Sequence, residues 1–307
     1  METQTEQRVD PKEFVSNLLD LQYREVMMAF ATGAVVLGAV VLFPGADSVT
    51  KGIQGNIGAT TVALFFLVAI FAAVVKGAIG FGYALITTPI FATVIDPAVA
   101  VVVLAIPPWM INVFQVGETN TGLEYIKQEW ALIGLAVLGS VAGVFFLASF
   151  EKGPIIPFLI GVLLLGYVIF ELVSGFFVVE EAHHPLALGA VGLGEGFLLA
   201  AANLGPLLPA YLHTFERNKE RYVGGLSMVF TFVFTARIVQ MTLQDVMTTY
   251  QLWLGCAIAV VTIFGLLIGT YVRRLEIDEQ KFNWFVIAIL FVIALNIFRN
   301  TIPAIFL

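Results

Sequence analysis

Residues 75–89 read VKGAIGFGYALITTP and lie in the middle of one of the most apolar segments of the chain. An ordinary membrane-crossing helix would not carry a lysine and three glycines there. Each ionisable side chain inside a bilayer costs free energy, and each glycine weakens a helix. We therefore interpret the stretch as a break in a helix at membrane depth, where non-helical backbone is tolerated only beside protein or a water-filled cavity.

The composition places most of the chain in a membrane. Of its 307 residues, 59% are hydrophobic and only 12% are charged, whereas a soluble surface needs far more charge. Long apolar runs recur from Val26 onward, so we predict an all-α, polytopic membrane protein. Lys and Arg are few and scattered, which argues against nucleic-acid binding. The single cysteine, Cys256, excludes an internal disulfide and a cysteine-based metal site.

A membrane-crossing helix needs about 20 apolar residues. Seven segments meet this requirement: Val26–Phe43, Pro97–Val116, Trp130–Phe150, Ile155–Val179, Tyr222–Gln240, Leu252–Val272 and Phe282–Ile305. Thr60–Ile95 is too long for one span, and Leu186–His213 is interrupted by AANLGP (Ala201–Pro206), which leaves arms of roughly 14 residues or about 21 Å. We predict that both are re-entrant hairpins. For Thr60–Ile95 the alternative is that both arms cross the membrane, which leaves the topology of the rest of the chain unchanged.

Basic residues orient the chain, because cytoplasmic loops carry an excess of Lys and Arg. The basic loops are the N-terminal tail, ERNKER (216–221) and RRLEIDEQK (273–281). With the tail inside, one crossing per span and none per hairpin, the other two basic loops also fall inside. Thr242–Tyr250, which has no basic residue, falls outside. We therefore expect a multi-pass protein of the cytoplasmic membrane with a cytoplasmic N-terminus, whose polar tail lacks the pattern of a cleaved signal.

Each hairpin is followed by three spans, which divides the chain into a tail (1–25), an extra helix with an outer loop (26–58), repeat 1 (59–180) and repeat 2 (181–307). At an offset of about 125 residues AIG (78–80) aligns with NLG (203–205) and NVFQ (112–115) with RIVQ (237–240). Gly139 and Gly143 align with Gly265 and Gly269 as GxxxG spacings, which permit close helix packing. An odd number of crossings inverts the second unit, and inverted repeats with broken helices are typical of secondary transporters.

Each break is predicted to begin a half-helix, near Tyr83 in the first hairpin and at Pro206 in the second. Both starts present unpaired N–H groups and the positive end of a helix dipole at membrane depth. Together they predict an anion pocket formed by Gly80, Phe81, Gly82 and Tyr83 at one tip and Gly205 and Pro206 at the other. The alternative is that the glycines only permit tight packing of the tips.

Polar residues inside the predicted spans point to the same chemistry. Arg237 and Gln240 lie on one helix face, Asn112 and Gln115 repeat that spacing, and Asn203 lies at the second tip. Guanidinium and amide donors suit an oxyanion, so we predict that these residues bind the substrate, with Arg237 as the main ligand. For the amides, hydrogen bonding between helices is the alternative, and for Arg237 the alternative is a structural role.

Two charged residues leave alternatives open. Lys76 either adds positive charge at the first tip or extends to the outer surface. Glu195, in GLGEGF, either carries a coupled proton or pairs with a cation of a loop near the cytoplasmic entrance.

Two glycine-patterned stretches define the broken elements, GAIGFGYALITTPIF (77–91) and GLGEGFLLAAANLGPLLPAYL (192–212), each followed by an apolar span. In this order they resemble the TauE/SafE sulfite exporter family over about Thr60–Phe298. The resemblance implies an ion-coupled carrier of sulfite, organosulfonates or related sulfur anions. It also implies that the family's hairpin tips correspond to Gly77, Gly80, Gly82 and Pro89 and to Gly192, Gly196, Gly205 and Pro206. Phe81 and Tyr83 depart from the commoner triple-glycine tip and suit an organic sulfonate, and the extra leading helix is a second departure.

The leading hypothesis is a secondary transporter that moves a small sulfur-containing oxyanion by alternating access, with Glu195 as the proton-coupling group. A passive anion channel of the same fold is the alternative. An enzyme is not predicted, because the three histidines and one cysteine show neither metal-ligand nor nucleophile–base spacing. We expect no cofactor and no metal. The expected partners are the anion and the lipid bilayer, and the sequence leaves open the anion, the direction of transport and whether the chain forms a homo-oligomer.

The predicted topology is testable by cysteine labelling in a Cys256→Ala background. A cysteine at Asn218 is expected to react only with reagent on the cytoplasmic side, and one within Thr242–Tyr250 only with reagent on the outside. Labelling of position 218 from outside would contradict the inverted arrangement of the repeats.

Overall fold

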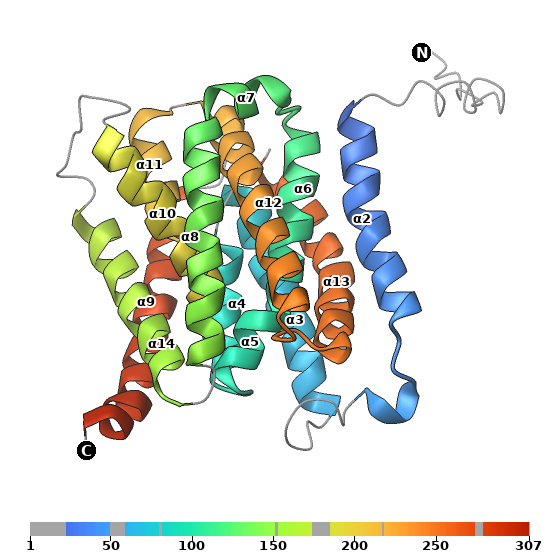
Figure 1. Ribbon diagram of the computed structural model, residues 1–307, viewed down its shortest axis with the longest axis vertical. Helices are drawn as coiled ribbons and strands as arrows, with labels where there is room; N and C mark the ends of the chain where they lie inside the picture. The colour runs from blue at the N-terminus through green and yellow to red at the C-terminus, as the bar shows by residue number, and fades with distance from the viewer. Residues whose placement is uncertain are drawn as a thin grey trace, which may run out of the picture.

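The computed structural model describes residues 23–49, 59–79, 82–150, 153–173, 185–216, 218–273 and 279–306, which form a bundle of helices (Figure 1). Within these ranges six helical stretches are long and apolar enough to cross a membrane: Arg24–Val41, Thr60–Ala78, Pro97–Glu118, Trp130–Ser149, Lys219–Leu243 and Thr249–Val272. Large apolar side chains cover the outside, and Leu243 for example is 79% exposed. The prediction of an all-α, polytopic membrane protein is therefore confirmed.

The helices follow the chain with short connections. They are α2 (Tyr23–Val41), the short η1 (Ala46–Ser48), α3 (Ala59–Ile79), α4 (Tyr83–Ala92), α5 (Pro97–Val103), α6 (Ile106–Glu118), α7 (Leu123–Gln128), α8 (Trp130–Ser149), α9 (Ile155–Val173), α10 (Pro185–Ala202), α11 (Leu207–Phe215), α12 (Lys219–Leu243), α13 (Thr249–Arg273) and α14 (Glu279–Phe306). Five of the seven predicted spans are among the six long stretches. The other two, in α9 and α14, supply shorter apolar stretches at Ile155–Ile169 and Leu290–Ile305.

The first predicted hairpin is a long helix followed by a short one. α3 has 21 residues and α4 has 10, so α3 is long enough to cross a membrane, whereas α4 reaches only about 15 Å. The alternative in which both arms cross is therefore wrong. α4 begins at Tyr83 as predicted, and Gly82 before it has a φ of 103°, a left-handed conformation that favours glycine.

The second predicted hairpin has the same unequal form. α10 has 18 residues and α11 has 9, so the predicted arms of roughly 14 residues each are wrong. The alanines before Asn203 favour helix and carry α10 as far as Ala202. Asn203 then adopts a left-handed φ of 57°, and α11 starts at Leu207 with Pro206 as its N-cap, one residue after the predicted start.

The predicted span Pro97–Val116 is divided into α5 and α6 at Leu104 and Ala105. The cause is the pair Pro107 and Pro108, which have no N–H groups to bond the carbonyls four residues earlier. Backbone carbonyls are therefore released at this point, deep inside the bundle.

Glycines bring two pairs of helices into close contact. A Cβ on Gly139 or Gly196 would collide with the facing backbone in the α8–α10 contact, and one on Gly265 or Gly269 would collide with backbone of α3 in the α3–α13 contact. The GxxxG helix of each predicted repeat thus packs on the long arm of the other repeat's hairpin. In Figure 1, α10 and α11 lie in the upper part of the view and α4 and α5 in the lower part. These contacts match the predicted inverted repeat, which itself stays a prediction.

The extra helix α2 is part of the bundle and contacts both predicted repeats. A Cβ on Gly117 of α6 would lie 2.8 Å from the Arg24 carbonyl oxygen, and one on Gly38 would lie 2.7 Å from the Cys256 Sγ atom of α13. Its outer face stays exposed, as Val40 at 70% illustrates.

The α8–α10 contact leads to a stability prediction. Gly196→Val is expected to lower the melting temperature in detergent by several degrees, because overpacking costs about 1–3 kcal/mol and facing backbone cannot yield. Gly189→Val is the matched control on the same helix, since nothing lies within 4 Å of the Cβ that it would add. Equal melting temperatures for the two variants would contradict the close approach of α8 and α10.

Candidate functional site

A small cavity lies where the two hairpin breaks meet. Its described lining is Lys76, Gly82, Tyr83, Ala84, Leu85, Pro108, Asn112, Leu199, Gly205, Pro209, Phe230 and Phe234. Its volume is about 40 Å³, and a buried water needs about 10–15 Å³ by this measure, so the cavity has room for about three water-sized groups. Among the described lining residues, Lys76 is the one charged side chain.

The N-terminus of α4 forms one wall of this cavity. Tyr83, Ala84 and Leu85 are its first three residues, and their amides precede the first bond of the helix, from the Ile86 amide to the Gly82 carbonyl at 3.2 Å. No side chain caps the terminus. The Tyr83 hydroxyl lies 3.1 Å from the Thr262 hydroxyl of α13, which fixes the start of the helix. Unpaired amides and a positive dipole end make this wall attractive to an anion.

Lys76 lies in the last turn of α3 and is only 4% exposed. Its Nζ donates to Asn112 Oδ1 at 3.1 Å and lies 5.8 Å from the centroid of the Phe230 ring. The side chain thus stays inside the bundle and does not extend to the outer surface. An ammonium group can only donate, so the Asn112 carbonyl faces it and the Asn112 Nδ2 amide is a further donor.

Asn203 connects the second break by hydrogen bonds to α4 and to the α5–α6 break. Its Nδ2 donates to the Thr88 hydroxyl of α4 at 2.8 Å and to the Leu104 carbonyl at 3.0 Å. The Leu104 carbonyl is free to accept because Pro108 has no N–H to offer it. Asn203 therefore supplies a hydrogen-bond donor to a backbone carbonyl of the α5–α6 break. It is fully buried and is not among the described residues that line the cavity.

Arg237 of α12 is fully buried and completes the same break. Its Nη1 donates to Asn203 Oδ1 and its Nη2 to the Val101 carbonyl, both at 2.6 Å. That carbonyl is available because the Ala105 amide bonds Val102 instead. Arg237 is not among the described residues that line the cavity. Its role as the main ligand stays a prediction, and these contacts support the structural alternative.

Glu195 of α10 caps the N-terminus of the second half-helix. Its side chain is fully buried, and Oε2 accepts from the Leu207 amide at 2.9 Å and the Leu208 amide at 3.2 Å. Gly205 separates this carboxylate from the cavity, since a Cβ there would lie 2.7 Å from Glu195 Cδ. These partners of Glu195 are backbone amides and not a cation of a loop. The two half-helices therefore differ, because α4 opens on the cavity and α11 is already capped.

The two glutamines lie outside the cavity lining. Gln115 is buried and accepts from the Ser227 hydroxyl of α12 at 3.1 Å. Gln240 donates to the Val141 carbonyl of α8 at 3.1 Å. Both contacts join helices, which was the alternative that the sequence left open for the amides.

Of the other predicted residues, the structure brings Lys76, Asn112, Gly82, Tyr83 and Gly205 into one lining. Pro206 is buried as the N-cap of α11 and lies outside that lining. Gly80 and Phe81 lie outside the described residues.

Several lining residues were not predicted from the sequence. Phe230 and Phe234 lie seven and three residues before Arg237 and so share its helix face, and Pro108 lies one turn before Asn112. Helical periodicity around the predicted polar residues would have found these three. Leu199 and Pro209 carry no such signal, because they are apolar residues in apolar segments.

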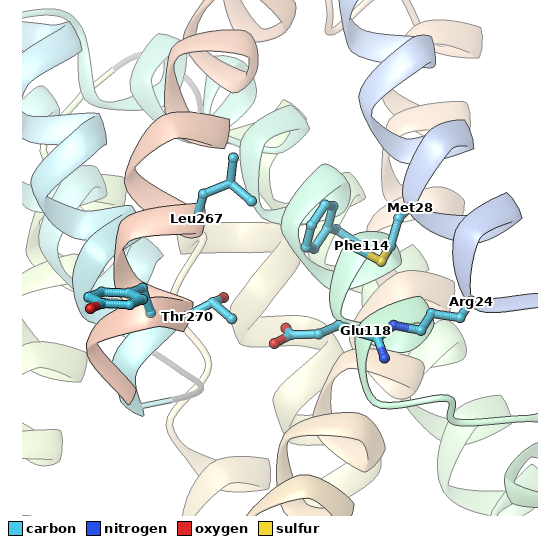
Figure 2. Close-up of a pocket in the computed structure, with 7 residues that line it drawn as sticks. Arg24, Met28, Phe114, Glu118, Leu267 and Thr270 are labelled. Carbon is cyan, nitrogen blue, oxygen red and sulfur yellow. The ribbon is translucent and has the colours of Figure 1, made fainter. Parts of the chain in front are cut away.

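A second cavity of about 260 Å³ lies between α2, α6 and α13, lined by Arg24, Met28, Phe114, Glu118, Leu267, Thr270 and Tyr271. Figure 2 shows the Glu118 carboxylate pointing from α6 toward Thr270, with Arg24 reaching in from α2. Glu118 lies about 120° around α6 from Asn112, given 100° per residue. The lining of this second cavity carries one charge of each sign, Arg24 and Glu118, whereas Lys76 is the one charged side chain in the described lining of the central cavity. The smaller central cavity is therefore the better anion site. In the described ranges, no three His, Cys, Asp or Glu residues gather as metal ligands.

The fold and this cavity define a multi-pass helical membrane protein with a small, positively charged cavity at its helix breaks. The family model for the sulfite exporter TauE/SafE matches residues 65–297. The chain therefore belongs to this family of membrane transporters, and the resemblance predicted over about Thr60–Phe298 is confirmed. No curated protein and no solved structure matches the chain significantly.

The contacts of Arg237 lead to a test of its two roles. Arg237→Ala is expected to lower the melting temperature strongly, because each buried carbonyl left without a partner costs about 1–3 kcal/mol. Gln240→Ala, one turn further along the same helix, is the matched control and is expected to melt close to the wild type. If the alanine variant at 237 instead melts normally and loses anion binding, Arg237 is a ligand.

Proposed function

We propose that this protein is a secondary transporter of a small sulfur-containing oxyanion and that the anion binds at the N-terminus of α4 beside Lys76. The observation that carries the proposal is the meeting of an uncapped helix N-terminus, a buried ammonium group and an amide side chain in one small cavity. The family match supports sulfite or a related anion as the substrate.

The chemistry of the lining suits an oxyanion. The oxygens of such an anion accept N–H groups, and the Tyr83, Ala84 and Leu85 amides, Lys76 and Asn112 are all donors. Hydrogen bonds to a charged acceptor are about twice as strong as neutral ones. The rings of Phe230 and Phe234 lower the local dielectric, which strengthens these bonds further. A bound anion also offsets the free energy that burial of the Lys76 charge costs.

The size of the cavity supports an inorganic anion in this conformation. A volume of about 40 Å³ suits sulfite, a sulfur atom with three oxygens, better than a sulfonate with a carbon chain. An organic sulfonate, for which Tyr83 at the first tip would be a suitable neighbour, requires the cavity to widen. Binding of sulfite in preference to taurine is the expected order.

The arrangement of the helices supports alternating access. α3 packs on α13 and α10 on α8, so each broken hairpin is held by a helix of the other predicted repeat. Two inverted units that meet at a central site can rock against each other and expose it to one side at a time. The inverted repeat and the cytoplasmic N-terminus are both part of this proposal.

Proton coupling is assigned to Glu195. Its carboxylate lies directly behind Gly205, at the edge of the anion cavity, and it is fully buried. A buried carboxylate beside a transport site is a common proton carrier in membrane transporters.

Counterflow in proteoliposomes tests the transport and the site together. Vesicles preloaded with unlabelled sulfite are expected to accumulate labelled sulfite, which a carrier does and a passive channel does not. Lys76→Met is expected to lower this uptake at least about tenfold, equivalent to about 1.4 kcal/mol, and Lys76→Arg is expected to retain part of it because the charge remains.

Lys127→Met in the exposed helix α7 is the matched control and is expected to transport normally. Normal counterflow by Lys76→Met would show that the anion binds at another site. No counterflow by the wild type with sulfite, thiosulfate, taurine or sulfoacetate would contradict the proposed function.

A further inference from the structure

The two half-helices that border the central cavity differ in whether a side chain caps their N-terminus. The α4 terminus has no side-chain cap, whereas the α11 terminus holds the Glu195 carboxylate on the Leu207 and Leu208 amides. At the offset of about 125 residues the position equivalent to Glu195 is Ile70, so the fold does not require a carboxylate there. A negatively charged group therefore already occupies one of the two anion positions that the predicted repeat creates.

Glu195 is close to the cavity, and only one of its two carboxylate oxygens has hydrogen-bond partners. Oε2 accepts both amide bonds, while the buried Oε1 has no hydrogen-bond partner. Gly205 lies between this carboxylate and the cavity, and only a glycine leaves enough room. A buried carboxylate oxygen without a partner is costly, and binding a proton would remove that cost.

We infer, on the basis of the proposed anion transport, that the Glu195 carboxylate is an internal anion that competes with the transported anion for the N-terminal amides of α11. In the proton-free state the carboxylate holds the amides. When Glu195 binds a proton it becomes a neutral acid with little attraction to the dipole, and the anion held at the α4 terminus by Lys76 extends its hydrogen bonds to the α11 amides. Two negative charges repel each other across these few ångströms, so the anion and the proton bind together.

The surroundings of Glu195 are consistent with titration by one proton. The helices α5 and α8, which pack against α10, contain no titratable residue. The other helices that pack against it contribute Tyr167 and Glu171 in α9, Tyr211 and His213 in α11, and Lys219, Glu220, Arg221, Tyr222 and Arg237 in α12. Of these, Arg237 donates to Asn203 and Val101, and Lys219, Glu220 and Arg221 form the first turn of α12 at its far end from Arg237.

The competition has a thermodynamic signature. Coupling between two binding events is reciprocal, so a proton that strengthens anion binding is itself taken up when the anion binds. Anion affinity is then expected to fall by up to tenfold for each pH unit above the titration of Glu195. A carboxylate that neither shared the anion's amides nor lay close enough to repel its charge would show no such link at equilibrium.

Calorimetry on the purified full-length protein measures this link. Thiosulfate is the probe, because it carries no proton of its own near neutral pH. Titrations in two buffers with different heats of ionisation are expected to show about one proton taken up per anion by the wild type. Glu195→Gln mimics the protonated state, and it is expected to bind thiosulfate with no proton uptake and with an affinity that does not change between pH 6 and 8.

Two further variants complete the experiment. Glu195→Asp is too short to reach the α11 amides, so it is expected to bind thiosulfate more tightly than the wild type at pH 8 and with weaker pH dependence, even if the glutamine variant does not fold. Glu118→Gln makes the same change in the second cavity, between α2, α6 and α13, and is expected to keep the wild-type proton uptake.

The outcomes separate this inference from the proposed function. Anion binding and counterflow by the wild type without proton uptake, or unchanged proton uptake by Glu195→Gln, would overturn the competition and leave the transporter intact. A Glu195→Gln variant that only melts earlier, with the wild-type pH profile of affinity, would make Glu195 a structural cap. Absence of binding and of counterflow with all the anions tested would overturn the proposed function itself.

Discussion

Backbone groups that a helix break releases inside a membrane have no water to bond, so each break needs partners from the protein. The carbonyls of Val101 and Leu104, which lack the usual amide partners four residues later at the α5–α6 break, are bonded by Arg237 and Asn203. The amides at the start of α11 are bonded by Glu195. Polar side chains that look out of place in apolar segments thus complete the interrupted backbone, and the centre of the bundle depends on them.

One helix terminus is the exception to this rule. The start of α4 has no side-chain cap and borders the cavity that contains Lys76 and Asn112. The two predicted repeats therefore differ in charge. Repeat 1 carries a lysine where repeat 2 has Ala201, and repeat 2 carries Glu195 where repeat 1 has Ile70. A symmetrical pair of breaks would offer two equal anion positions, whereas we propose that this pair offers one open position and one filled by Glu195.

Arg237 is a fully buried cation in the middle of the apolar helix α12. The high cost of a charge at the bilayer centre predicts an internal partner or a cavity for this side chain. A bound anion and a backbone carbonyl both meet this requirement, because both accept hydrogen bonds from a guanidinium group. The partner carbonyl belongs to Val101, an ordinary residue of an apolar helix. It is available because the Ala105 amide bonds the Val102 carbonyl instead where α5 ends.

Local sequence was sufficient to predict the membrane class, five of the seven spans, the positions of both hairpin breaks and the glycines that let helices approach. These features follow from local hydropathy, turn chemistry and residue size. The sequence also marked Lys76, Asn112, Gly82, Tyr83 and Gly205, which the structure brings into one lining. Tertiary contacts determine the capping of α11 by Glu195 and the absence of Gln115, Gln240 and Arg237 from that lining. Those outcomes depend on which face of each helix meets which neighbour, and contacts between residues a hundred positions apart leave no mark on local sequence.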